Sequence, residues 1–407
     1  MFEIRTITAD DVDLFRARVS QGFGDDIDDD DKARQRFDAI FDFDRTLAAF
    51  DGNDIVGTCA AFSLGLTVPG GSEVSMGGTT VITVRPTHRR RGVLRALMSS
   101  HLDEIAGREE PLAGLWASEG SIYGRFGYGP ATHRHKLAID GRRVAFSAGA
   151  PEGSVRLLEP EEAESFIRPV YEQARRQRAG MLTRSDGWWT HRLMADPESW
   201  RNGKSSHRHA IYEEGGQVTG YAVYRQKSKW ENSLPEGQVS VTEVIATSPS
   251  AHHGLWRYLT SIDLFPNVEY WNLPVDDPLP LEVENPRQVS RKLEDALWVR
   301  LIDVPSALRA RGYQADGAVT FTVHDSVRPS AAGCYHLEVA DGAGECRRVD
   351  ARPELELDME ALSRLYLGGG DAIAVARAGR IDGDPDAVTK LHRLMRTDAT
   401  PWCPEVF

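Results

Sequence analysis

Three consecutive arginines followed by a glycine, Arg89, Arg90, Arg91 and Gly92, are the residues whose types and spacing best fit a chemical task. Guanidinium groups bind phosphate oxygens well, and glycine lets the backbone approach a ligand closely. Cations are disfavoured at the N-terminal end of a helix, where the helix dipole is positive, unless an anion binds there. If a helix starts at Gly92, we expect a pyrophosphate to bind here; the alternative is a solvated basic surface.

The neighbouring residues predict a strand before this turn and a helix after it. Residues 81–84 are Val-Ile-Thr-Val, a β-branched run typical of a strand, and Pro86 ends it because proline cannot donate to a strand ladder. After Gly92, apolar residues recur on one helical face: Val93, Leu94, Leu97, Met98, Leu102 and Ile105. Together these elements form an anion-binding unit, because the first turn of a helix has free N–H groups.

This unit and a second motif resemble a known family. The run R-R-R-G-V-L resembles the Arg/Gln-x-x-Gly-x-Gly/Ala pyrophosphate loop of the GNAT N-acetyltransferases, with Leu94 in place of the usual small residue. More narrowly, T-H-R-R-R-G-V-L-R-A-L, W-A-S-E-G-S-I-Y-G-R-F-G-Y-G and the three-part length of the chain are similar to the actinobacterial Eis (enhanced intracellular survival) family. Members of that family acetylate amines, aminoglycosides among them, and form hexamers. The resemblance implies an N-acetyltransferase that uses acetyl-CoA as co-substrate and needs no metal.

The composition agrees with an enzyme of this kind. The 407 residues are 41% hydrophobic and 27% charged, with a formal net charge of −13, which argues against nucleic acid as a partner and is compatible with a cationic substrate. The four cysteines are scattered and indicate neither a zinc site nor a disulfide framework. We find no apolar run of membrane-spanning length. The N-terminus reads as a strand and not as a signal peptide, so we expect a cytoplasmic protein without a membrane partner.

The expected elements divide into three domains. Residues 1–150 contain predicted strands at 2–8, 45–50, 54–66, 73–84, 112–117 and 132–140, with helices between them. A Gly- and Pro-containing linker follows at 148–153, and further domains are expected at 151–290 and 291–407. The predicted fold class is α/β with mixed sheets. By resemblance it comprises two tandem GNAT domains, the second degenerate, and a C-terminal sterol-carrier-like α+β domain.

The second domain is expected to be a copy of the first without its phosphate loop. V-I-T-V-R-P-T-H-R-R-R-G-V-L-R-A-L matches V-I-A-T-S-P-S-A-H-H-G-L-W-R-Y-L at the strand end and the proline. His252 and His253 stand where the first copy has arginines. Adjacent histidines rarely bind one metal ion together, and no acidic residue or cysteine has ligand spacing from them, so we do not expect a metal site there.

Acetyl transfer to an amine requires a bound acetyl donor, a deprotonated amine, a stabilised oxyanion and a proton for the leaving thiolate. The resemblance implies that residues 82–84 hold the pantetheine arm through strand-edge backbone groups and that an N–H near Val84 stabilises the oxyanion. Residues 89–95 would bind the pyrophosphate, and Ser118 and Glu119 would contact the coenzyme again. The expected coenzyme-binding residues are thus Ile82, Thr83, Val84, Arg89, Arg90, Arg91, Gly92, Val93, Leu94, Arg95, Ser118 and Glu119.

Two tyrosines are candidates for the general acid, Tyr123 and Tyr128 of I-Y-G-R-F-G-Y-G. A phenol with a pKa near 10 can donate to a thiolate whose conjugate acid has a pKa near 8.5. From the residues alone the choice is even, since either ring also fits a hydrophobic core. The resemblance implies that Tyr123 is the acid.

The end of the chain is apolar and stiff, with Pro401, Trp402, Pro404 and Phe407. Chain ends usually fray, so a terminal phenylalanine predicts that this end is buried. By resemblance, the α-carboxylate of Phe407 is the catalytic base, acting directly or through water. An unperturbed α-carboxyl has a pKa of about 3.5, so burial would have to raise it.

The acceptor pocket is expected to be wide and acidic. Asp25 and Asp26 begin a run of acidic residues that is either a solvated loop or a negative rim for cationic amines. Glu405 and Trp116 are expected to line the same pocket; the family can have a histidine in place of Trp116. We therefore predict acetylation of aminoglycoside-like or lysine-type amines. Two alternatives are a GNAT enzyme with one narrow metabolite substrate and a non-catalytic lipid-binding protein on a GNAT scaffold.

Overall fold

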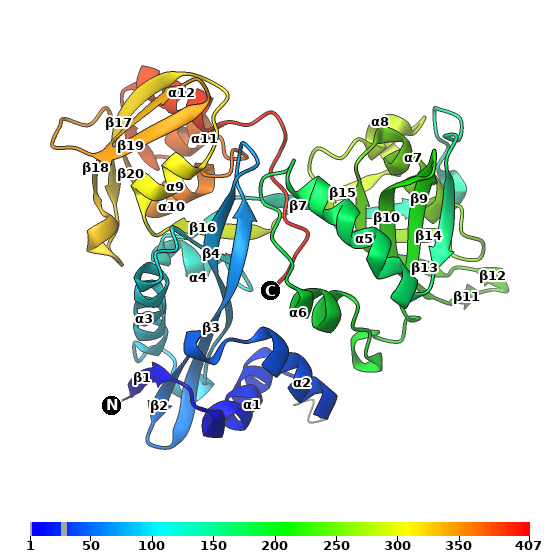
Figure 1. Cartoon of the computed structure of the whole chain (residues 1–407), viewed down its shortest axis with the longest axis horizontal. Helices are drawn as coiled ribbons and strands as arrows, with labels where there is room; N and C mark the ends of the chain where they lie inside the picture. Colours follow the sequence, from blue (N-terminus) through cyan, green and yellow to red (C-terminus); the bar gives the residue numbers. More distant parts are fainter. Residues whose placement is uncertain (1, 26–30) are drawn as a thin grey trace. The chain divides into compact units, whose positions relative to one another are not determined.

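The computed structural model describes residues 2–25 and 31–407, which form two compact units (Figure 1). Unit 1 consists of Met1–Thr132, Ala179–His191 and Ala296–Phe407, and unit 2 of His133–Arg178 and Arg192–Asp295. The end of the chain and a short middle segment therefore belong to the same unit as the N-terminal strands and the arginine turn.

The main sheet of unit 1 has the strand order β1-β2-β3-β4-β5-β16-β6. Its strands are β1 (Glu3–Thr6), β2 (Thr46–Asp51), β3 (Asp54–Thr67), β4 (Glu73–Val84), β5 (Leu112–Trp116), β16 (Leu297–Leu301) and β6 (Gly129–Pro130). Strands β1 to β4 form an antiparallel meander, as expected from the sequence. The helices that follow or precede these strands are α1 (Val12–Phe23), α2 (Asp31–Ile40), α3 (Val93–Gly107) and α4 (Gly120–Tyr123).

Strand β3 is buried almost without interruption, which indicates a strand covered on both faces. Helix α3 packs one apolar face on the sheet, and Gly57 of β3 allows this approach: a Cβ there would lie 2.9 Å from side-chain atoms of Leu97 and Val93. Helix α1 lies against β4 in the same way, since a Cβ at Gly22 would lie 2.5 Å from the Thr83 side chain. The two helices thus fix the positions of β3 and β4.

Strands β4 and β5 run parallel side by side and then separate. Their ladder pairs Met76 with Leu112, Gly77 with Ala113 and Gly78 with Gly114. The rest of β4, residues 79–84, extends beyond this ladder and pairs only with β3 through a bulge, near which Val81 has a φ of +46°. The two strands therefore form a fork whose vertex is at Gly78.

Two strands have partners that differ from the sequence prediction. Residues 132–140 form the expected strand, β7 (His133–Asp140), but it pairs with β14 and β15 in unit 2 and not with the first sheet. Its place beside β5 is taken by β16, which comes far later in the chain and pairs with β5 from Leu297↔Trp116 to Leu301↔Leu112. The alternation of residues predicts a strand but does not identify its neighbour.

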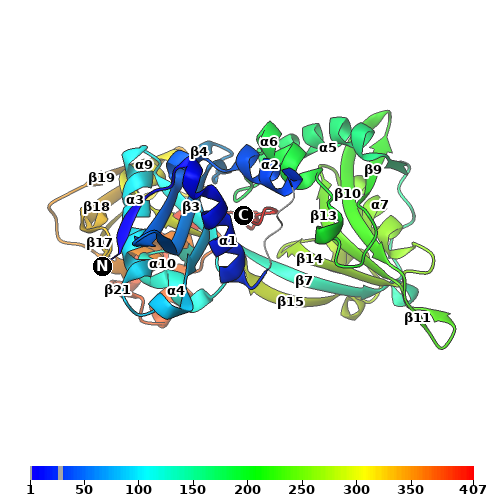
Figure 2. The ribbon, with the colours of Figure 1, turned by 90° about the horizontal axis from the view of Figure 1, so that it is seen from below.

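Unit 2 contains a sheet with the strand order β15-β7-β14-β13-β10-β9-β8. Its other strands are β8 (Ser154–Leu158), β9 (Arg208–Glu214), β10 (Gln217–Lys227), β13 (Gln238–Ala246), β14 (Asn267–Pro274) and β15 (Ser290–Asp295), and its helices include α5 (Pro160–Arg175), α7 (Pro249–Thr260) and α8 (Leu279–Glu282). Figure 2 shows β7 and β15 as long neighbours. Strands β9 and β10 form a hairpin, and the predicted strand–Pro–helix repeat, β13 followed by α7, is confirmed.

The C-terminal part of unit 1 is a smaller α+β layer, as predicted. Its sheet has the order β19-β18-β17-β20-β21. The strands are β17 (Gly317–His324), β18 (Gly333–Ala340), β19 (Ala343–Arg348), β20 (Leu355–Asp358) and β21 (Ile381–Gly383), and the helices are α9 (Val304–Ala310), α10 (Met359–Leu365), α11 (Ala372–Arg377) and α12 (Pro385–Met395). From here the chain runs past β4 and ends near α6 (Asp186–Trp188) (Figure 1).

Helix α2, which follows the acidic run, was not predicted from the sequence. Phe37 of α2 and Phe41, just after the helix, stack at 4.0 Å between ring centroids, and Phe41 contacts Phe62 of β3. In the described part of the chain, no helix combines the length and the apolarity that crossing a bilayer requires.

Candidate functional site

The fork between β4 and β5 presents the predicted strand edge. Ile82, Thr83 and Val84 are half-buried and lie beyond the end of the parallel ladder. Because the ladder to β5 ends at Gly78, this stretch of β4 has an edge on which backbone N–H and C=O groups can pair with an extended ligand. This is the geometry that a pantetheine arm requires, and residues 82–84 are where the sequence analysis expected it.

The turn from β4 to α3 has the backbone expected of an anion-binding loop. Arg90 has a φ of +63° and Gly92 a φ of +85°, and Gly92 is the N-cap of α3 without a side-chain cap. Because no capping side chain occupies them, the N–H groups at the start of α3, from Val93 to Arg95, can bind an anion. Arg89, Arg90 and Arg91 are exposed around this turn. The turn therefore fits a pyrophosphate in both charge and geometry.

The equivalent helix of unit 2 is closed to an anion. Helix α7 begins with Ser248 as N-cap, whose hydroxyl accepts a hydrogen bond from the N–H of Ala251 at 3.1 Å. The serine oxygen accepts a hydrogen bond from the first turn of α7, as a bound anion would from the first turn of α3 after Gly92. Unit 2 thus keeps the strand and the helix of the repeat, but the N-terminus of its helix is capped. The copy is degenerate in the sense that it lacks an open helix N-terminus at which an anion could bind.

Tyr123 lies in α4, close to the strand end of β5. Its ring is 6% exposed and packs in a cluster with Met98 and Leu102 of α3 and with Trp298 of β16. Burial raises the pKa of Tyr123, and a hydrogen bond with the Ser118 side chain partly opposes that increase. The phenol is therefore protonated throughout the neutral range, as a general acid must be before it reacts.

Ser118 and Glu119, the predicted coenzyme contacts after β5, lie between β5 and α4. The N-cap of α4 is Glu119 and not Ser118, and no side chain caps this short helix. Ser118 instead interacts with Tyr123. Both residues are exposed at the end of β5, where a coenzyme lying in the fork would pass.

Tyr128, the other candidate acid, is held in a buried chain of hydrogen bonds. Its hydroxyl lies 2.9 Å from Oγ1 of Thr79, which lies 2.8 Å from Nε2 of His101. All three side chains are at most 2% exposed. Burial and the charge of Arg45 lower the pKa of His101 to about 3, so its imidazole is neutral. Tyr128 contacts Tyr123 edge to face at 6.3 Å; its surroundings are those of a core residue.

Phe407 lies at the vertex of the fork. A Cβ placed on Gly78 would lie 2.5 Å from Cδ1 of Leu64 and 3.2 Å from Cε2 of the Phe407 ring, so a glycine at this position lets both side chains pack closely on β4. The ring also packs edge-on against Phe62 of β3 at 6.4 Å between centroids. Residues 401–405 are buried, as predicted for the apolar tail, whereas Val406 is 41% exposed and Phe407 is half-buried, so the prediction that the terminal residue is buried is wrong in part.

Glu405 and Trp116, which the sequence analysis assigned to the acceptor pocket, both take part in holding this tail. The Glu405 carboxylate is 4% exposed and is paired with Arg184, while Nε1 of Trp188 donates to it at 3.0 Å. Trp116, at the end of β5, interacts with the thiol of Cys403. Nothing in the sequence pattern pointed to Arg184 or Trp188, which lie more than two hundred residues before Glu405.

Of the two predicted acidic acceptor residues, Asp26 lies outside the described residues. Asp25 is exposed directly after α1. It follows Gly22, the glycine that packs against Thr83, by three residues. Asp25 therefore follows the last turn of α1, the turn that packs on Thr83 of β4.

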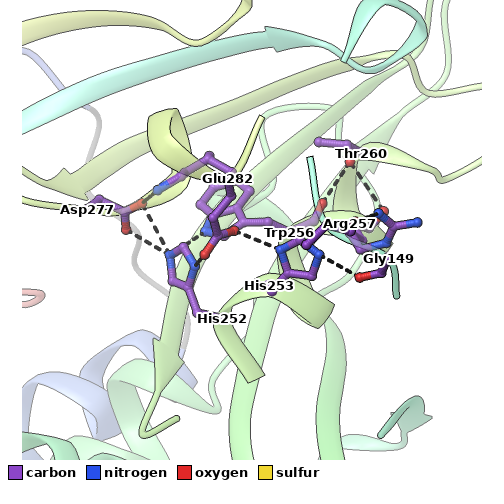
Figure 3. Close-up of polar contacts among 10 residues, drawn as sticks. Gly149, His252, His253, Trp256, Arg257, Thr260, Asp277 and Glu282 are labelled. Atoms are coloured by element: carbon purple, nitrogen blue, oxygen red, sulfur yellow. Dashed lines mark hydrogen bonds and ion pairs between the residues drawn. The ribbon is translucent and has the colours of Figure 1, made fainter. Parts of the chain in front are cut away.

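The two histidines of the repeat are bound by carboxylates (Figure 3). His252 contacts Glu282 through Nδ1 at 2.8 Å and Asp277 through Nε2 at 3.2 Å. His253 contacts the second oxygen of Glu282 at 3.3 Å and the carbonyl of Gly149 at 3.2 Å. Each histidine thus joins α7 to a neighbouring loop or to α8, and the described residues contain no group of three or more ligand side chains arranged to hold a metal ion.

Comparison with known proteins defines the class of enzyme. Residues 3–131 and 180–301 match two family models, each described as an acetyltransferase (GNAT) domain, and residues 304–404 match the sterol carrier protein domain. A GCN5-related N-acetyltransferase from Anabaena variabilis has the same fold over the full length of both chains, with a TM-score of 0.87 at 18% identity. The chain is an N-acetyltransferase with two GNAT domains and a sterol-carrier-like domain, and the GNAT fold uses acetyl-CoA.

Closer relatives define the family. An uncharacterized N-acetyltransferase of Streptomyces avermitilis is 37% identical over 410 residues, which is 100% of this chain and 99% of the relative. N-acetyltransferase Eis of Mycobacterium tuberculosis is 37% identical over 336 residues, 81% of this chain and 80% of the relative. The crystal structure of Eis1 from Mycobacterium abscessus matches with a TM-score of 0.84 and 32% identity over all of both chains. The chain belongs to the Eis family of GNAT N-acetyltransferases.

Proposed function

We propose that this enzyme transfers the acetyl group of acetyl-CoA to primary amines of aminoglycoside-like or lysine-type acceptors, with Tyr123 as general acid and the α-carboxylate of Phe407 as base. The observation that carries the proposal is the position of Phe407. Its ring lies against Gly78, where β4 and β5 separate. In the proposed mode of binding, the strand edge beyond Gly78 holds the pantetheine arm, so the chain terminus lies beside the reacting end of the coenzyme.

The proposed roles follow from where each group lies. Arg89 to Arg91 and the N-terminus of α3 bind the pyrophosphate, residues 82–84 bind the pantetheine arm, and an N–H near Val84 stabilises the oxyanion. Acetyl-CoA supplies an acetyl group bound as a thioester. The Phe407 carboxylate takes a proton from the acceptor ammonium, and the Tyr123 hydroxyl gives a proton to the leaving sulfur.

Two observations support a cationic acceptor. The chain has a net charge of −13, and Asp25 is exposed after the last turn of α1, which packs on Thr83. Acidic side chains around a site concentrate cations near it and accelerate their encounter. We further propose that six copies assemble, as in the family, and that the enzyme acts in the cytoplasm.

The test is the release of CoA from acetyl-CoA in the presence of a panel of kanamycin-class antibiotics, spermidine, lysine and a lysine peptide. Turnover on several aminoglycosides is expected, and it should weaken as salt screens the acidic rim. Tight acetyl-CoA binding without turnover on any amine of the panel would replace this proposal with a narrow, different acceptor. No binding of acetyl-CoA at all would favour a lipid carrier on a GNAT scaffold.

A further inference from the structure

The C-terminal tail is fixed by a short segment of the chain that returns to unit 1. The N–H of Gly180 donates to the carbonyl of Thr67, and the N–H of Thr67 donates to the carbonyl of Met181, both at 2.8 Å, so this segment extends the end of β3. The tail lies on its other side: the N–H of Trp402 donates to the carbonyl of Ala179 at 2.9 Å. The tail is therefore attached to the sheet through residues 179–183.

Gly180 shows how closely these two segments approach. Its φ is +96°, and a Cβ there would lie 2.8 Å from the carbonyl oxygen of Trp402. Any side chain at this position would displace the tail backbone, which cannot move aside as a flexible side chain could. At Gly180 the backbone of the returning segment therefore packs directly against the backbone of the tail.

The last fixed point before the terminus is the carboxylate of Glu405. Arg184 contacts one carboxylate oxygen and Nε1 of Trp188 donates to the other at 3.0 Å. The side chains of Arg184 and Glu405 are 0% and 4% exposed. A buried charge pair of this kind is held in one geometry, because separating it would leave an uncompensated charge without water.

Trp188 connects this fixed point to the side chain of the terminal residue. Its ring packs edge-on against Phe62 at 5.2 Å, and Phe62 packs edge-on against Phe407 at 6.4 Å. Only Val406 separates Glu405 from Phe407. The terminal residue is therefore held on both sides, through the backbone by Glu405 and through its ring by Phe62.

We propose that Arg184, Trp188 and Glu405 form a clamp that positions the C-terminal carboxylate for catalysis; this rests on the proposed role of that carboxylate as base. The three are positioning residues and do not touch the substrate. Glu405 then acts through the two residues that follow it and not as a lining of the acceptor pocket.

The test compares Glu405→Gln with a matched control, Glu110→Gln. Glu110 also forms a buried pair with an arginine, Arg45, with side-chain exposures of 10% and 0%. It lies 3.1 Å from the Cβ position of Gly77, whereas Phe407 approaches Gly78, and consecutive strand residues face opposite sides of a sheet. Both variants lose a buried charge, but only one of them releases the tail.

Two measurements are made on each full-length variant. In Glu405→Gln, kcat is expected to fall about 10- to 100-fold with the KM for acetyl-CoA unchanged, because a small misplacement of a reacting group costs rate and not coenzyme affinity. Carboxypeptidase is expected to release Phe407 faster from this variant than from the wild type. Glu110→Gln should match the wild type in both measurements. Trp188→Phe, which keeps the ring and removes the N–H, should repeat both effects more weakly and covers the case in which Glu405→Gln does not fold.

The outcomes separate the clamp from the proposed base. Faster release of Phe407 with unchanged kcat would show that the tail is clamped but that its position does not matter for the reaction, which overturns the proposal. Unchanged release of Phe407 from both tail variants would also overturn it, because no clamp would then exist. If deletion of Phe407 from the wild type leaves kcat intact, the proposed base itself has failed, whatever the clamp variants do.

Discussion

At the scale of single residues, the chemistry depends on which of two neighbouring tyrosines is the acid. Tyr123 lies beside the end of β5 and interacts with the exposed Ser118, whereas Tyr128 is bound inward to Thr79, which in turn contacts His101. The sequence motif could not distinguish them, since both are aromatic residues in a Gly-rich turn. The structure separates them by their polar partners: Tyr123 interacts with the nearby Ser118, and Tyr128 with Thr79 from a distant part of the chain.

We predict that Tyr123→Phe retains acetyl-CoA binding and loses most of its turnover. The substitution removes the proton but keeps the buried ring, so kcat should fall about 10²- to 10⁴-fold, the usual contribution of a general acid. Calorimetric binding of acetyl-CoA and steady-state kinetics measure the two quantities separately. Tyr128→Phe serves as control and should lose far less kcat. An unchanged kcat in Tyr123→Phe would remove this residue as the acid.

A second residue-scale prediction concerns stability at high pH. Burial lowers the pKa of His252, but Asp277 and Glu282 outweigh this and raise it to about 9. The pKa of a histidine in the unfolded chain is about 6.5. The interaction of charged His252 with Asp277 and Glu282 therefore stabilises the fold fully below pH 6.5. This contribution, about 3 kcal/mol from the difference of the two pKa values, is lost as pH rises through 9.

The comparison of wild type with His252→Gln tests this directly. The difference in the free energy of unfolding should be largest near pH 6, shrink as pH rises from 6.5 to 9, and be small above pH 9. His253→Gln, in which one oxygen of Glu282 and a backbone carbonyl lose a partner, leaves His252 paired with Asp277 and Glu282 and is the matched control. A difference that is the same at pH 6 and pH 9.5 would contradict the assignment of a charged His252.

At the scale of elements, the two helix N-termini show why one repeat binds an anion and the other does not. Helix α3 begins at an uncapped Gly92, and α7 begins at Ser248, which caps it. The sequence predicted both helices and the loss of the loop, because apolar periodicity and the proline are local signals. The cap itself was not predicted, although a serine before a proline at the start of a helix is a recognisable N-cap pattern.

We predict that Gly92→Ala weakens acetyl-CoA binding. Gly92 has a φ of +85° with open space around it, so the cost arises from the backbone and not from a clash, about 1 kcal/mol. Relaxing the strain changes the direction of the first N–H groups of α3, which raises the KM for acetyl-CoA. Gly379→Ala is the matched control, with a φ of +72° and equally open surroundings. It should lose similar stability and keep its KM. Equal KM values in both variants would argue against the anion-binding role of this turn.

The sequence did not predict which strands pair with one another. Residues 132–140 and 297–301 are both recognisable as strands, yet the nearer one leaves the first sheet and the farther one joins it. Alternation sets which face is buried, but the neighbour is selected by contacts across the whole chain. The same is true of the aromatic contacts from Phe41 through Phe62 to Phe407, which join three remote segments.

At the scale of the whole molecule, the first sheet is incomplete without the C-terminal part of the chain. Strand β16 is entirely buried between β5 and β6. We therefore predict that residues 1–150 produced alone do not form a stable acetyltransferase domain, since β5 would expose an unpaired edge. Circular dichroism and gel filtration of the fragment should show aggregation or partial unfolding. Recovery of a folded, acetyl-CoA-binding fragment would support residue 150 as a boundary between independent domains.

The proposed role of the C-terminal carboxylate can be tested by extending the chain beyond Phe407. Addition of a few glycine and serine residues after Phe407 moves the carboxylate away from the vertex of the fork but leaves the ring and the Glu405 contacts in place. We predict that kcat falls at least about 100-fold, the scale of a lost general base, while acetyl-CoA binding is unchanged. The same extension at the N-terminus is the control and should be fully active. If the C-terminally extended enzyme keeps its kcat, the base must be sought among the side chains around the fork, and the terminal carboxylate is then only a neighbour of the site.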